Sequence, residues 1–258
     1  MRILGADFSG GQSPSITIVG GVLHDGVLTI DTLRHCDDRL DLYAEIALRG
    51  EPLLCGLDFP FRLPQAAMKQ LCVDDLSALS LRLLRSEFAE VLATQVGRYE
   101  GKCSAASLYC RETDAACTAY SGLKRVNPSL VAMLYAGSKL LSYLRRSGVM
   151  IYPLDVPAQK QVCEVYPSHT WARVGLARST DIASFVGAFN ALGLLHVVLP
   201  AEFHAVASQD TADSIVACIT TAAAQHIDRI YEDWTARPSF ATHAEWVVAH
   251  LEGIIVRI

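Results

Sequence analysis

The segment Arg2-Ile-Leu-Gly-Ala-Asp7-Phe8 is an apolar run that is interrupted by a single carboxylate. Ser15–Leu23 alternates between apolar and other side chains, and His24-Asp-Gly26 is a tight-turn signal that leads into Val27–Leu33. Three strands in succession, joined by short turns, predict an antiparallel meander at the start of a sheet.

The next elements predict that the sheet continues with parallel strands. Arg39–Arg49 has helical periodicity, and Pro52–Asp58 is a continuous apolar run typical of a buried strand. Because a helical crossover returns the chain in the same direction, we expect this strand to lie parallel to the first. Further strands are expected at Val149–Tyr152, Val162–Tyr166 and Gly253–Ile258. Further helices are expected at Ser168–Val174, Asp181–Leu192 and Thr211–Ala224.

Between the strand at Pro52–Asp58 and the strand at Val149–Tyr152, the chain is predicted to be mostly helical over Leu63–Arg146. Helices are expected there at Leu76–Val96 and Leu130–Leu144. The order of elements is that of a ribonuclease H-like α/β fold, a mixed sheet of three antiparallel strands and then parallel strands, flanked by helices. We expect one domain over residues 1–258, in which residues 62–148 form a helical insertion that serves as a lid or substrate platform.

Acidic residues stand in apolar surroundings at four separate places, and these are Asp7, Asp58, Glu164 and the pair Asp210 and Asp213. An unpartnered buried carboxylate is costly, and a hard cation that prefers oxygen ligands satisfies several carboxylates at once. Residues three apart on a helix share a face, so Asp210 and Asp213 are expected to point together toward the sheet. Each acid alone is explained equally well by helix capping or by an arginine partner, so the metal hypothesis rests on the set.

Composition limits the remaining classes of protein. The eight cysteines include no Cys-x-x-Cys pair, which argues against zinc, and we expect them to be reduced. With a strand beginning at residue 2 and apolar runs that are short and interrupted, we expect no signal peptide and no membrane span. Reduced cysteines in a chain without a signal sequence predict a cytoplasmic location. The net charge of −5 counts against binding of a long duplex and favours a small or enclosed substrate.

Four short motifs together resemble a known family. These motifs are Gly5-Ala-Asp7-Phe-Ser, Gly56-Leu-Asp58-Phe-Pro60, Glu164-Val-Tyr-Pro167 and Asp210-Thr-Ala-Asp213-Ser. In order and spacing they resemble the DUF429 family of predicted ribonuclease H-fold nucleases, over nearly the whole chain. The last motif is also similar to that of the RuvC-type Holliday-junction resolvases, with Ser214 in place of the usual Ala.

The resemblance implies a metal-dependent phosphodiester hydrolase that acts on nucleic acid or a nucleotide with two Mg²⁺ or Mn²⁺ ions. Asp7 would bridge the ions, Asp58 would hold one, and Asp210 with Asp213 would hold the other. Glu164 would be an outer ligand or would orient the attacking water, although pairing with an arginine such as Arg173 explains it equally well.

Two residues are candidates for substrate binding. Ser9, with the glycines that follow it, would let a phosphate approach closely, and Arg111 lies in the predicted insertion. For Arg111 and its neighbour Asp114, a solvated helix surface is the favoured interpretation.

Two other functions stay open. The main alternative is an inactive ribonuclease H-fold protein that binds or regulates, because fold does not fix function. A phosphotransferase of the actin-like superfamily is a further alternative, because Asp7-Phe-Ser-Gly-Gly11 is similar to its first phosphate loop.

Overall fold

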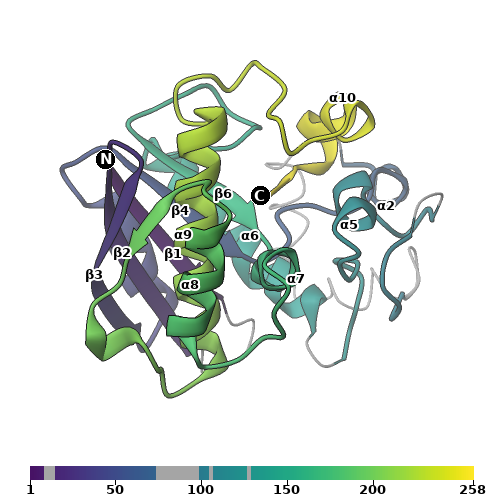
Figure 1. Ribbon diagram of the computed structural model, residues 1–258. Coiled ribbons are helices and arrows are strands. Elements are labelled where there is room, and N and C mark those ends of the chain that lie inside the picture. The colour runs from purple at the N-terminus through teal and green to yellow at the C-terminus, as the bar shows by residue number, and fades with distance from the viewer. Residues whose placement is uncertain (9–14, 74–98, 105–106, 127–128) are drawn as a thin grey trace.

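The computed structural model describes residues 1–8, 15–73, 99–104, 107–126 and 129–258. These residues form an eight-stranded sheet in the order β5-β6-β4-β1-β2-β3-β7, with β8 paired to β6 (Figure 1). The first strands are β1 (Arg2–Asp7), β2 (Ile16–His24), β3 (Val27–Cys36) and β4 (Leu53–Asp58), and the later ones are β5 (Met150–Ile151), β6 (Lys160–Val165), β7 (His196–Val198) and β8 (Ile255–Val256).

The predicted mixed sheet is confirmed. The pairs β1–β2 and β2–β3 are antiparallel, and every other pair of neighbouring strands is parallel. The turn between β2 and β3 lies at Asp25 and Gly26, as predicted, and both residues have positive φ angles, 47° and 74°. Glycine and aspartate tolerate this left-handed conformation better than most residues, which explains why the hairpin forms here.

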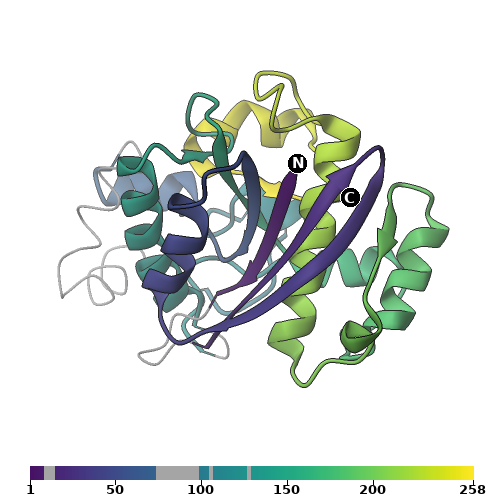
Figure 2. The same ribbon diagram turned by 90° about the vertical axis from the view of Figure 1, so that its left-hand side faces the viewer.

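Helices cover both faces of the sheet (Figures 1 and 2). The first face packs against α7 (Pro167–Arg173), α8 (Ile182–Ala191) and the long helix α9 (Gln209–Asp228). The second face packs against α1 (Arg39–Ala47) and α6 (Leu130–Arg146). Two hydrophobic cores result, one on each side of the strands.

Two glycines let α9 lie close to the centre of the sheet. Gly5 of β1 and Gly56 of β4 are register partners. A Cβ on Gly5 would lie 2.1 Å from the backbone N of Cys218, and a Cβ on Gly56 would lie 2.1 Å from Oγ1 of Thr221. The glycines thus allow close backbone contact, which brings the first turn of α9 to the ends of β1 and β4.

The segment between β4 and β5 contains α2 (Gln65–Gln70), α5 (Glu112–Ala116) and α6. The helix expected at Leu76–Val96 lies outside the described residues. Helix α10 (His243–Glu252), which the sequence pattern did not predict, lies beside α2 and α5 (Figure 1). Its Glu252 carboxylate accepts hydrogen bonds from the backbone N–H groups of Gln65, at 2.9 Å, and Glu112, at 3.0 Å, and so ties the three helices together.

Strand β7 and the 3₁₀ turn η2 (Ala201–Phe203) were also not predicted. No described helix is both long enough and apolar enough to cross a lipid bilayer.

Candidate functional site

Strand alternation places Asp7 and Asp58 side by side. They are register partners at the last positions of the parallel strands β1 and β4. Ile3 and Leu54 pack in the core that contains α9, and side chains two and four residues further along point to the same face. Asp7 and Asp58 therefore face the α9 side at the carboxyl edge of the sheet, where open α/β sheets commonly bind ligands. Asp7 is the last residue of β1, and Asp58 is the last residue of β4.

Helix α9 brings the other two aspartates to this edge. The Ser208 side chain caps the helix by accepting a hydrogen bond from the Thr211 N–H at 3.1 Å. Asp210 then lies in the first turn, and Asp213 follows at the next position on the same face. Ser214 fixes the helix against the sheet, because its hydroxyl accepts from the Asp7 N–H at 3.0 Å and lies 3.0 Å from the carbonyl oxygen of Thr17.

A cavity of about 470 Å³ lies over these residues. Asp7, Asp58, Asp210 and Arg178 line its polar part. Described residues from the segment between β4 and β5 line another part, and these include Ala119, Tyr120, Ser129, Leu130, Ala132 and Met133. The predicted insertion thus contributes to the cavity wall.

The carboxylates at this edge repel one another. Burial raises the pKa of Asp7 to about 8, with a further contribution from the negative charges of Asp210 and Asp213. Burial also raises the pKa of Asp58 well above its usual range, and Asp7 and Asp213 add to the effect. The positive charge of Arg178 lowers the pKa of both aspartates, but this effect is smaller than that of burial and of the neighbouring carboxylates. Within the described part of the chain, Arg178 is the cation whose charge acts on Asp7, Asp58 and Asp213.

Asp213 differs from Asp7 and Asp58 in its hydrogen bonds. Its Oδ1 accepts from Nε1 of Trp171 at 3.0 Å and from Nε2 of Gln209 at 3.1 Å. Its Oδ2 accepts from Nη2 of Arg178 in a close ion pair. The pKa of Arg178 is raised: partial burial would lower it, but the hydrogen bond and charge of Asp213 outweigh that effect.

The residues at this edge fit a divalent cation by charge. No hydrogen bond from a described residue reaches the side chain of Asp7 or Asp58, and burial, together with the neighbouring carboxylates, raises the pKa of both groups. Among the described residues, however, no three His, Cys, Asp or Glu side chains already converge as a metal site.

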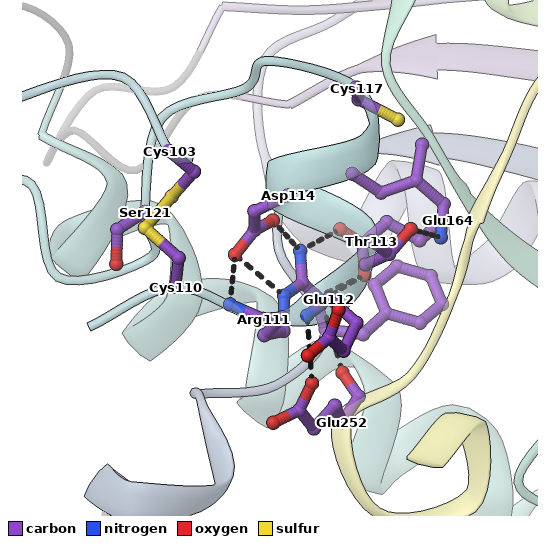
Figure 3. Close-up of polar contacts among 12 residues, drawn as sticks. Cys103, Cys110, Arg111, Glu112, Thr113, Asp114, Cys117, Ser121, Glu164 and Glu252 are labelled. Atoms are coloured by element: carbon purple, nitrogen blue, oxygen red, sulfur yellow. Dashed lines mark hydrogen bonds and ion pairs between the residues drawn. A yellow bond between two sulfur atoms is a disulfide. The ribbon is translucent and has the colours of Figure 1, made fainter. Parts of the chain in front are cut away.

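Glu164 lies in a different environment from the aspartates. Its neighbours Cys163 and Val165 pack in the α9-side core, so alternation directs Glu164 to the opposite face. There it pairs with Arg111: Nη1 donates to Oε2 at 2.7 Å and Nη2 donates to Oε1 at 2.5 Å (Figure 3). Burial raises the pKa of Glu164, against the effect of Arg111. Pairing with an arginine was one of the two predictions for Glu164, but the partner is Arg111 and not Arg173.

Arg111 and Asp114 are not a solvated helix surface, and that interpretation is wrong. Both side chains are only 1% exposed. Arg111 donates to both carboxylate oxygens of Asp114, from Nε at 3.1 Å and from Nη2 at 2.6 Å, and also to the carbonyl oxygen of Glu252 at 3.2 Å (Figure 3). Arg111 thus joins α5, β6 and the end of α10, and its donors are largely occupied.

A disulfide precedes this cluster. Cys103 and Cys110 are bonded (Figure 3), so the expectation that all eight cysteines are reduced is wrong for this pair. The other six are free thiols. Because the cytoplasmic location rested partly on reduced cysteines, it loses that support and stays a prediction.

The structure therefore brings together Asp7, Asp58, Asp210 and Asp213 of the predicted residues, and it places Glu164 and Arg111 in a buried ion-pair cluster that lines the same cavity. Ser9 lies outside the described residues. The sequence motifs did not predict Arg178, Trp171 or Gln209 as site residues. Gln209 could have been found, because it is four residues before Asp213 on the same helix, but Arg178 lies in a connecting segment without a motif.

In comparisons with protein-family models, with curated proteins and with solved structures, nothing matched this chain. The similarity to the DUF429 family and to RuvC-type resolvases stays a prediction from the four motifs.

Proposed function

We propose that this protein is a metal-dependent phosphodiester hydrolase, nuclease-like in its chemistry, on a ribonuclease H-like fold. The observation that carries the proposal is the meeting of four aspartates from β1, β4 and α9 around one guanidinium, at the carboxyl edge of the sheet. Such an excess of negative charge is costly, and it is retained where a cation or a reaction requires it.

Asp7, Asp58 and Asp210 would hold Mg²⁺ or Mn²⁺, because hard cations take carboxylate oxygens, and Asp213 lies beside them. When bound, the metal would polarise a phosphoryl oxygen and lower the pKa of a bound water. The chain's own contribution is to hold the carboxylates in register and to enclose the substrate between the sheet edge and the insertion.

The cavity favours a small substrate. A volume of about 470 Å³ lies in the range of small-molecule sites. Its wall combines aspartates with Tyr120, Leu130 and Met133, which suits a phosphoester with an apolar or planar group. A nucleotide or the end of a single strand fits these features better than a long duplex does, in agreement with the net charge of −5.

Two observations favour the inactive alternative. Asp213 is already paired with Arg178, and no metal site is preformed among the described residues. In a binding protein on this fold, the arginine would replace the cation permanently.

The test is the effect of Mn²⁺ on the melting temperature of the wild-type protein, Asp7→Asn and a control. Asp25→Asn is a matched control, because it makes the same change at the exposed β2–β3 turn, away from the carboxyl end of β1. We expect Mn²⁺ to raise the melting temperature of the wild type and the control and to leave Asp7→Asn unchanged. No shift in the wild type would favour the inactive alternative, and an equal shift in Asp7→Asn would refute binding at Asp7.

A further inference from the structure

Hydrogen bonds fix the side chain of Asp213, as is typical of a residue that orients another side chain. Its side chain is 1% exposed, and three donors from three different parts of the chain occupy its two oxygens. Trp171 belongs to the hydrophobic core and Gln209 belongs to α9, so both donors come from elements that pack against the sheet. By contrast, Asp7 and Asp58 accept no hydrogen bond from the described residues.

Arg178 is the partner of Asp213 that reaches the cavity. Its side chain is 48% exposed, and it lines the cavity together with Asp7, Asp58 and Asp210. The bond to Asp213 uses one of the five N–H donors of a guanidinium, and no other described residue accepts a hydrogen bond from it. Because the half-exposed side chain lines the cavity, its guanidinium is placed to meet a ligand there, and a guanidinium fork matches two oxygens of a phosphate.

We propose that Arg178 binds the phosphate of the substrate and that Asp213 is a positioning residue for Arg178, not a metal ligand. This inference rests on the proposed function, and it leaves Asp7, Asp58 and Asp210 as the metal-binding carboxylates. Phosphate binding at Arg178 then depends on metal, because the three carboxylates repel an anion until a cation neutralises them.

Two binding measurements separate the roles. The first is the affinity for Mn²⁺ alone, measured by electron paramagnetic resonance of the free ion. The second is the affinity of the Mg²⁺-saturated protein for inorganic phosphate, measured by calorimetry. The variants are Asp213→Asn, Arg178→Gln and Asp7→Asn, and the matched control is Arg173→Gln, which makes the same change on an exposed arginine of α7.

We expect Asp213→Asn and Arg178→Gln to retain wild-type or tighter affinity for Mn²⁺ and to lose roughly tenfold or more in phosphate affinity, the scale of one charge-assisted hydrogen bond. Arg178→Lys, which keeps the charge but loses the fork, should recover part of the phosphate affinity. Asp7→Asn should lose Mn²⁺ affinity, and Arg173→Gln should change neither value. If Asp213→Asn does not fold, Arg178→Gln tests phosphate binding without altering Asp213.

A loss of Mn²⁺ affinity in Asp213→Asn as large as that in Asp7→Asn would overturn the positioning role and make Asp213 a ligand, with the proposed function intact. Unchanged phosphate affinity in Arg178→Gln would overturn the phosphate role. Failure of Mn²⁺ to bind the wild type at all would instead refute the proposed function, and with it this inference.

Discussion

The backbone N–H of Asp7 donates a hydrogen bond to the hydroxyl of Ser214, 3.0 Å away, and joins residues 207 positions apart in the sequence. The same hydroxyl lies 2.8 Å from the carbonyl oxygen of Asp210, so one side chain connects the end of β1 to the first turn of α9. Ser214 thus sets the position of two proposed metal ligands relative to each other.

Replacement of Ser214 by alanine removes this connection with little change in volume. We expect the free energy of unfolding to fall by about 1 kcal/mol, the usual net value of one hydrogen bond, with a larger cost if the Asp7 N–H stays unsatisfied. Urea denaturation measures the change. Ser239→Ala is a control, because the structure gives the Ser239 side chain no role in the site, and a cost as large there would contradict the explanation.

Gly56→Ala should destabilise the protein by about 1–3 kcal/mol, because the added methyl group would overlap Oγ1 of Thr221 on α9. Since the obstacle is a side-chain atom, Thr221→Ala should recover part of this loss when the two changes are combined. At Gly5 the obstacle is the α9 backbone, so no such rescue is expected for Gly5→Ala. Additive costs in the Gly56 and Thr221 double variant would argue against this contact.

Arg111→Met should cost about 3–5 kcal/mol, because it leaves the buried carboxylates of Asp114 and Glu164 without their cation. Glu164→Gln in the same chain should recover part of the loss, since it removes one of the unpaired charges. Arg34→Met is the matched control, because Arg34 pairs with Glu45 on the surface and such pairs contribute about 1 kcal/mol or less. Equal costs at the two arginines, measured by denaturant unfolding, would contradict a buried ionic role for Arg111.

The local sequence predicted those parts of the fold and site that depend on short-range patterns. Alternation in β1 and β4 and the tight turn at Asp25 and Gly26 set the central strands, and the spacing of Asp210 and Asp213 set their common helix face. The same alternation, applied to Cys163 and Val165, would also have placed Glu164 on the opposite face.

Other features depend on contacts between distant segments, which a single sequence does not specify. Strand β7 pairs with β3, which is distant in the sequence, and Arg178 reaches Asp213 from a connecting segment without a recognisable pattern. Arg111 looked like a surface residue because its partners Glu164 and Glu252 are 53 and 141 positions away. The burial of such a charge becomes favourable only once the whole cluster has assembled.

Titration of thiols tests the disulfide. We expect six reactive thiols per chain in the denatured, unreduced protein, and two more after treatment with a reductant, from Cys103 and Cys110. Cys103→Ser should lower the free energy of unfolding by roughly 2 kcal/mol, as estimated for a short closed loop. Cys72→Ser is a control, since Cys72 is an exposed free cysteine. Eight reactive thiols before reduction would show that the pair is not bonded.

The metal-free protein should lose stability as the pH rises from about 4 toward about 8. Burial and neighbouring carboxylates raise the pKa of Asp7 to about 8 and raise that of Asp58, so the folded state binds protons more tightly than the unfolded state. A raised carboxyl pKa favours folding at low pH, and this contribution is lost through the interval between the unfolded and folded pKa values.

Several acids outside the site have lowered pKa values and act in the opposite direction, among them Glu45 and Glu245. The difference between the wild type and Asp7→Asn isolates the effect of Asp7. In a chelating buffer, we expect Asp7→Asn to gain stability relative to the wild type as the pH rises, because the neutral amide carries no charge to desolvate. Addition of Mn²⁺ should restore the stability of the wild type most strongly at the higher pH, where the carboxylates are ionised. A difference independent of pH would show that Asp7 does not titrate in this range.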